Sequence, residues 1–150
     1  MRLLMATGLS LLLLAGCSVN VDPDSGVDID SAPDLEEDWE GELEPQGSFT
    51  VRGAATALAN SAGTGISVSI AGADANSTHP WHIHEGDCGD GGPIVGDPGA
   101  YPFLQVGSNG TASANASIDV TLDELDDYYV NIHHSPEDMG TIVSCGELDD

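Results

Sequence analysis

A strict alternation of apolar and polar side chains between residues 111 and 122 constrains the fold of this 150-residue chain most. The apolar members of this stretch are Ala112, Ala114, Ala116, Ile118 and Val120. A period of two places these side chains together on one face of a β-strand. The Asn109–Gly110 pair just before the stretch is a strong hairpin turn signal.

Further segments share the features of short strands. Alternation recurs in residues 49–57 and 66–70, and residues 128–134 and 141–148 supply two more strands. No run of ten residues has the apolar spacing of a helix. The sequence therefore predicts an all-β domain, an antiparallel β-sandwich or barrel of about seven strands.

The N-terminus carries the features of an export signal. Arg2 precedes an apolar run, Leu3–Leu14, which is shorter than the roughly 20 residues that a membrane-spanning helix needs. The run ends in Leu14-Ala15-Gly16-Cys17, which resembles a bacterial lipobox. The serine that follows the cysteine, Ser18, resembles the residue found there in lipoproteins that are sorted to the outer membrane. Residues 1–17 are thus predicted to be a lipoprotein signal peptide with lipidation at Cys17, which anchors the chain in the bacterial envelope. An ordinary signal with an incidental cysteine is the alternative.

Residues 18–47 form an acidic segment between this signal and the domain. They hold eleven of the 26 acidic residues and little apolar surface, which predicts a disordered, extended linker. Such a linker is expected to act as a spacer between the membrane and the domain. Weak binding of cations by its carboxylates is the alternative. The whole chain has two basic residues and a formal net charge of −24, which excludes nucleic acid as a natural partner. The domain is predicted to span residues 48–150.

All five histidines lie in two windows, residues 79–88 and 131–140. Residues two apart share a face of a strand, so His82 and His84 should project together. His133 lies on the polar side of the second window's alternation. Pairing of the two strands would gather these three imidazoles on one outer face. Imidazole nitrogen binds copper, zinc, iron and nickel, so the pattern predicts a metal site. Surface imidazoles without a ligand are the alternative.

Three motifs resemble the copper/zinc superoxide dismutase family, whose members are Greek-key β-barrels. Residues 81–87, Trp-His-Ile-His-Glu-Gly-Asp, are similar to the family's aromatic-His-Val-His-Glu motif. Residues 133–140 are similar to its His-…-Asp-Asp-Leu-Gly run, and Cys145-Gly146 is similar to the close of its last strand. The resemblance covers roughly residues 48–150 and implies a superoxide dismutase-like fold.

The resemblance also implies a ligand set and a disulfide. It assigns His82, His84 and His133 as the ligands of a single copper ion. Cys88 and Cys145 lie where the family has its intrasubunit disulfide, and the oxidising compartment implied by export independently favours joining them.

Four neighbouring residues receive supporting roles from the resemblance. His79 matches a structural histidine that braces the copper loop, so it is expected just outside the ligand set. Glu137 falls where the family has an aspartate that links its two metal sites through hydrogen bonds, and Asp138 follows in the same run. His134 is expected to be a surface residue at a strand end or, alternatively, a fourth copper donor.

Two departures from the family pattern bear on function. Ile94 stands in place of the metal-bridging histidine, and Ile142 stands in place of the active-site arginine. No histidine lies between His84 and His133, so no zinc site is expected. A strongly acidic protein would also slow the arrival of superoxide, which is an anion.

Two classes of function follow. The first is an enzyme, a copper-only dismutase that removes superoxide in the envelope. The second is a non-catalytic module that captures or buffers copper. A second resemblance, to the small chordin-type (CHRD) domains, rests on the His-Ile-His motif and on the strand Val130–His133. It leaves a β-sandwich interaction domain as a further alternative.

Overall fold

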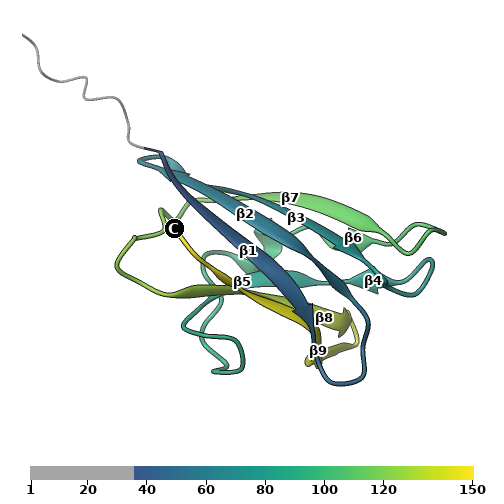
Figure 1. Ribbon diagram of the computed structural model, residues 1–150. Helices are drawn as coiled ribbons and strands as arrows, with labels where there is room; N and C mark the ends of the chain where they lie inside the picture. The colour runs from purple at the N-terminus through teal and green to yellow at the C-terminus, as the bar shows by residue number, and fades with distance from the viewer. Residues whose placement is uncertain (1–35) are drawn as a thin grey trace, which may run out of the picture. The chain divides into compact units, whose positions relative to one another are not determined.

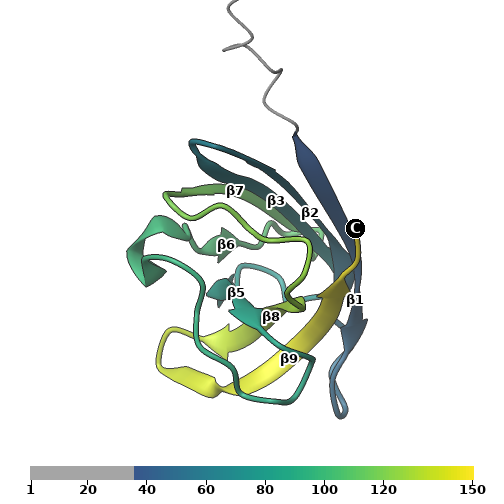
Figure 2. The ribbon, with the colours of Figure 1, turned by 90° about the vertical axis from the view of Figure 1, so that its left-hand side faces the viewer.

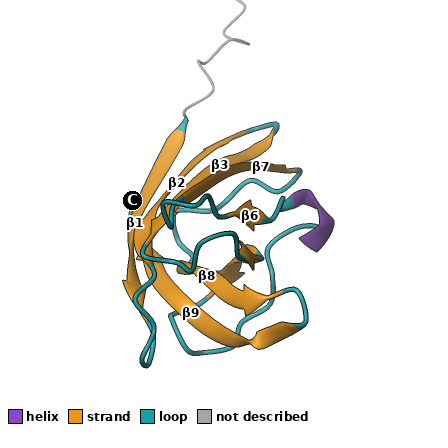
Figure 3. Ribbon diagram, turned by 90° about the vertical axis from the view of Figure 1, so that its right-hand side faces the viewer, coloured by secondary structure: helices purple, strands orange, loops and turns teal. Residues whose placement is uncertain are grey.

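The computed structural model describes residues 36–150 (Figure 1). The described residues form nine strands and one 3₁₀ turn. In chain order these are β1 (Glu37–Pro45), β2 (Arg52–Asn60), β3 (Gly63–Ala71), β4 (Thr78–His79), β5 (Trp81–Glu85), η1 (Pro98–Ala100), β6 (Leu104–Gln105), β7 (Ala112–Ile118), β8 (Tyr128–Ser135) and β9 (Asp138–Leu148). Within this part of the chain η1 is the only helical segment (Figure 3).

Seven strands form one antiparallel sheet, in the order β5-β8-β9-β1-β2-β3-β7. The sheet curls into a half-barrel, and the short β4–β6 pair lies across its open side (Figure 2). The prediction of an all-β antiparallel fold with about seven strands is confirmed. The sheet is a single curled layer, in which the core fills the concave side.

The alternation read from the sequence sets which side chains fill that core. Ala55, Ala57 and Ala59 of β2 are buried, as are Ile66, Val68 and Ile70 of β3. The prediction for residues 111–122 is wrong at its end. Strand β7 stops at Ile118, and Val120 beyond it is 38% exposed because no neighbouring strand pairs with it to continue the pattern.

Strand β1 corrects the predicted linker. Residues 18–47 were expected to be disordered, yet residues 37–45 form a central strand between β9 and β2. Trp39 and Leu43 of β1 are 2% and 1% exposed and lie in the core. The acidic residues alternate with them and face outward, so burial of two large side chains holds the strand in the sheet despite its charge.

Glycines let β1 and β9 cross closely. A Cβ on Gly41 would collide with the Glu147 backbone carbonyl, and a Cβ on Gly146 would collide with the Glu42 carbonyl. Strand β1 pairs with β2 over residues 37–43, and its last two residues pair with β9. This strand therefore joins the β2–β3–β7 side of the sheet to the β5–β8–β9 side.

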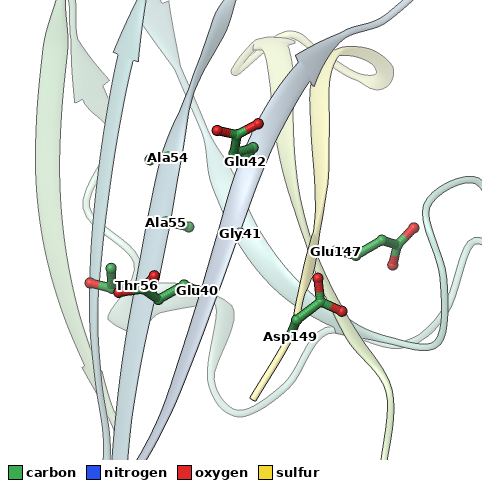
Figure 4. A pocket seen from close by; sticks show the side chains of 8 residues that line it. All are labelled: Glu40, Gly41, Glu42, Ala54, Ala55, Thr56, Glu147 and Asp149. Atoms are coloured by element: carbon green, nitrogen blue, oxygen red, sulfur yellow. The ribbon is translucent and has the colours of Figure 1, made fainter.

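The outer face of this junction is strongly acidic. Glu40 and Glu42 of β1 lie near Glu147 and Asp149 at the end of the chain, around a shallow hollow (Figure 4). Arg52 at the start of β2 is the one basic side chain among residues 36–150. This side of the sheet thus carries a negative potential.

The remaining N-terminal predictions lie outside the described residues. These are the signal peptide at residues 1–17, lipidation at Cys17 and the linker up to residue 35. Among residues 36–150, no helix is long and apolar enough to cross a membrane.

Candidate metal centre

Pairing of β5 with β8 brings the two histidine windows together. The register sets His82 opposite Asn131 and His84 opposite Tyr129. His133 lies at an irregularity in β8, where the pairing with β9 shifts on both sides of it, and its N–H donates to the Pro80 carbonyl at 2.8 Å. As a result, one ring nitrogen from each of His82, His84 and His133 lies within 4.8 Å of the others. The sequence-predicted cluster is formed, and it could hold a metal ion.

The sequence predicts that the three imidazoles lie on an outer face of the sheet. This prediction is wrong, because the cluster is buried. His82, His84 and His133 are 4%, 8% and 6% exposed. The chain after β5 folds back over them, where Ile94 pairs with His84 and the Tyr101 ring lies 5.2 Å from the His82 ring. The expectation failed because this covering segment returns through backbone pairing, which its side chains do not reveal.

Two backbone carbonyls orient the imidazoles. His84 donates from Nδ1 to the Gly92 carbonyl at 2.8 Å, and His133 donates from Nδ1 to the Met139 carbonyl at 2.7 Å. A carbonyl only accepts, so both protons lie on Nδ1 and both Nε2 atoms keep a free lone pair in the neutral ring. Nε2 of His84 is buried without a hydrogen-bond partner. Such an atom is costly to bury without a partner, and a metal ion bound at Nε2 would satisfy it.

The third donor is Nδ1 of His82. It lies 3.2 Å from Nε2 of His133, so these two nitrogens share one proton in the metal-free protein. A cation that displaced this proton would face Nδ1 of His82 and Nε2 of His84 and of His133. The donors present therefore fit a metal ion that prefers nitrogen ligands.

Burial keeps His82 and His133 uncharged. Desolvation, followed by the neighbouring imidazoles of His133 and His84, lowers the pKa of His82 from 6.5 to about 4. Desolvation also lowers the pKa of His133, and the hydrogen bond to Met139 partly opposes it. At pH 7 these rings are neutral, which is the form that binds metals.

The lowered pKa of His82 predicts an acid-sensitive metal-free protein. The unfolded chain binds a proton near pH 6.5 and the folded chain only near pH 4, so acid favours unfolding. Stability from His82 is complete above pH 6.5 and falls by about 2 to 3 kcal/mol as the pH drops to 4.5. Urea unfolding at pH 7.5 and 4.5 measures this loss.

The matched variants isolate the His82 contribution from that of the carboxylates. His82→Gln should lose part of the acid sensitivity, whereas His134→Gln should keep the wild-type pH dependence. An identical pH dependence in wild type and His82→Gln would contradict the assignment.

His79 lies next to the cluster and braces it. Its Nδ1 donates to the His133 carbonyl at 2.9 Å, and its Nε2 lies 2.9 Å from Oγ of Ser77. Both ring nitrogens are thus engaged, and His79 is not a member of the group that could hold a metal. Its hydrogen bond fixes the β8 backbone at His133, whose side chain carries one of the three candidate metal-binding nitrogens.

The other supporting residues do not contact the cluster. Glu137 and Asp138 are exposed in the β8–β9 hairpin, and among the described residues no hydrogen bond joins either one to His82, His84 or His133. Asp138 instead lies 3.4 Å from Nδ1 of His134, whose ring packs on Phe49. His134 points away from its neighbour His133 because adjacent residues of a strand face opposite sides. Backbone carbonyls, and not these carboxylates, hold the imidazoles of His84 and His133.

Known protein families and curated proteins provide no match to this chain.

The predicted disulfide is present and tethers the loop beside the site. Cys88 and Cys145 are joined across 57 residues of sequence. The Cys88 N–H also donates to the Glu147 carboxylate at 2.9 Å. Ile142 lines a hollow together with His84 and His133, so an aliphatic side chain stands beside the cluster.

Sequence reasoning missed three residues of the site. The carbonyls of Gly92 and Met139 orient two imidazoles, and backbone groups leave no sequence signal. The Tyr129 ring stacks on His84 with centroids 5.2 Å apart, and its hydroxyl accepts a hydrogen bond from the Gly92 N–H at 3.0 Å. Tyr129 lies four residues before His133, so the period of two places both on one face, but that pattern assigns no role to the Tyr129 ring.

Gly92 offers a direct test of carbonyl orientation. A Cβ at this position would collide with the Glu85 backbone carbonyl, so Gly92→Ala must displace the carbonyl that holds His84. We expect metal affinity to fall by about 10- to 100-fold, the usual effect of losing a partner of a metal-ligating histidine. Competition with a chromogenic copper chelator measures it. Gly140→Ala is the matched control, because a Cβ there meets open space.

Proposed function

We propose that this protein is an envelope lipoprotein whose superoxide dismutase-like domain binds a single copper ion. The observation that carries the proposal is the convergence of three buried imidazole nitrogens, one of which has no partner in the metal-free protein. His82, His84 and His133 would hold the ion. The carbonyls of Gly92 and Met139 would fix the ring orientations.

Copper is favoured over other metals by the donor set and by the resemblance. The cluster offers three neutral nitrogens and no carboxylate or thiolate among the described residues. Such a set suits Cu(I), whose single charge needs little compensation, while zinc also accepts three histidines with a water. The similarity of residues 81–87 and 133–140 to the copper motifs supports copper over zinc.

The proposed place in the envelope rests on the N-terminal sequence. The apolar run and the Leu-Ala-Gly-Cys stretch support lipidation at Cys17 and anchoring in the outer membrane. The Cys88–Cys145 disulfide agrees with an oxidising compartment outside the cytoplasm. Globomycin, which blocks lipoprotein signal cleavage, should cause accumulation of the longer precursor, and Cys17→Ser should release the protein from membranes.

Copper capture without turnover is supported best by the charge distribution. The acidic outer face attracts cations and repels anions (Figure 4). Arg52 is on β2, which is separated from the histidine strands by β9 and β1 in the sheet order. Ile142 offers no charge at the position of the family's arginine. Within residues 36–150 the site therefore has no nearby basic side chain to guide superoxide.

Dismutation of superoxide is the second candidate, and one observation favours it. A hollow of about 340 Å³ is lined by His84 and His133, which gives a small molecule a route to the cluster. Copper would supply the redox chemistry by cycling between Cu(I) and Cu(II). The residues around the hollow would only bind and orient the anion.

Copper titration with metal analysis tests the binding function. We expect one copper per chain, with retention against a competing chelator. Binding of more than one ion with equal affinity, or none, would contradict the proposal. Superoxide decay measured with the same loaded protein separates the two candidates, because a rate no faster than that of a free copper chelate leaves only capture.

A further inference from the structure

An open hollow of about 590 Å³ lies on the His82 side of the cluster. Its walls are almost wholly apolar, and they include Ile94, Tyr101, Pro102, Phe103 and Met139. Phe103 is 48% exposed and Met139 is 38% exposed, so large apolar side chains face solvent here. The volume lies in the range of sites for small organic molecules.

His82 supplies the polar group of this hollow. The residue is 4% exposed and lines the hollow. Its Nδ1 faces His133, while among the described residues no group hydrogen-bonds its Nε2, which is not fully buried and reaches solvent. The other two cluster histidines each have a carbonyl partner for the nitrogen that faces away from the cluster. A metal-ligating histidine normally donates its second N–H to an acceptor. Within residues 36–150, His82 is the member of the cluster that has no such acceptor.

Metal binding would reverse the hydrogen-bonding character of that nitrogen. In the metal-free protein the Met139 carbonyl keeps the His133 proton on Nδ1, so Nε2 of His133 accepts from Nδ1–H of His82. Nε2 of His82 then has a lone pair and accepts. A metal on Nδ1 displaces that proton, the neutral ring carries its proton on Nε2 instead, and Nε2 becomes a donor.

We propose that this hollow binds an uncharged aromatic molecule with one hydrogen-bond acceptor, and that it does so preferentially when a metal occupies His82. The proposal rests on the copper site of the proposed function. The Tyr101 and Phe103 rings and the thioether of Met139 favour an aromatic body. The acceptor satisfies the Nε2–H of His82. A charged ligand is disfavoured because no basic or acidic side chain lines the hollow.

Two compounds of nearly equal shape test the proposal. Acetophenone has a carbonyl oxygen where α-methylstyrene has a CH₂ group, so only acetophenone can accept from Nε2–H. Both are titrated into the ¹⁵N-labelled protein, metal-free and loaded with Cu(I), which is diamagnetic. Backbone amide shifts of Ile94, Gly99 and Phe103 report binding in the hollow.

We expect the Cu(I)-loaded protein to bind acetophenone about fivefold more tightly than α-methylstyrene, the usual size of one net hydrogen bond. This preference should disappear in the metal-free protein. Equal affinities in the loaded protein, a preference that persists without copper, or no binding of either compound would overturn the proposal.

Surface variants locate the binding. Phe103→Glu places a charge on the hollow's rim and should weaken both compounds at least tenfold. Leu125→Glu adds the same charge at a position that is 86% exposed and outside the hollow, and it should change neither affinity. Equal effects of the two variants would contradict binding in the hollow.

Failure of the metal site is distinguishable from failure of the hollow. Copper content is measured on the same samples, and imidazole ¹⁵N spectra show which nitrogen of His82 carries the proton. Copper-free samples after loading would refute the proposed function together with this proposal. One bound copper with the proton on Nε2, but no preference for acetophenone, would refute the proposal about the hollow alone.

Discussion

Replacing His82 and His133 together with alanine should lower copper affinity by at least about a thousandfold. The double variant removes two of the three convergent nitrogens and leaves His84 as a lone donor. Loss of one outer hydrogen-bond partner already costs about 10- to 100-fold in affinity, so the loss of two ligands must cost more. Competition with a chromogenic chelator of known copper affinity measures the change.

His134→Ala is the matched control for this double variant. His134 adjoins His133 in the sequence, but its side chain is 48% exposed and pairs with Asp138. Its removal should leave copper affinity unchanged, which also tests the idea of a fourth donor. Circular dichroism establishes that each variant keeps its strands. Wild-type affinity in a folded double variant would show that copper binds elsewhere.

Removal of the disulfide should have the largest effect on stability. Cys88 and Cys145 close a loop across 57 residues, which restricts the unfolded chain and contributes about 4 kcal/mol in the chain-entropy model. The variant Cys88→Ser/Cys145→Ser should lose most of this free energy of unfolding. Urea unfolding at pH 7.5, where His82 is neutral in both states, measures it.

The same variant should also weaken copper binding. The disulfide anchors the loop that leads to Gly92, whose carbonyl holds the His84 ring. A looser loop orients this donor less well, so we expect affinity to fall by about 10-fold. Reduction of the wild-type disulfide should reproduce the stability loss. A change in unfolding free energy below about 1 kcal/mol would contradict the role of the disulfide.

The histidine cluster could be predicted because it depends mainly on the spacing of residues within two short strands. His82 and His84 share a face through the period of two, and the antiparallel pairing of β5 with β8 supplies His133. The disulfide could be predicted because the domain holds two cysteines and the N-terminal sequence predicts export to an oxidising compartment. The cluster needed only residue types and strand geometry, whereas the disulfide also needed that predicted compartment.

Strand β1 could not be recognised because its composition opposes its structure. Four exposed acidic residues alternate with Trp39, Gly41 and Leu43, and the charge dominates any average over the segment. The segment is ordered because β2 and β9, which are distant in sequence, flank it and bury two large side chains. Only the assembled sheet provides that burial.

Apart from β1, the sequence by itself determined the long strands of the sheet, their apolar faces and which side chains can donate to a metal. These properties depend on residue type and on the fixed period of a strand. The tertiary structure alone decided that the imidazoles are buried, that Nδ1 of His82 faces His133 and that the His82 side chain lines an apolar hollow. Those outcomes depend on backbone carbonyls and on returning segments. Every residue carries the same backbone carbonyl, so the sequence does not indicate which carbonyls will orient the imidazoles. Only the folded chain shows where they lie.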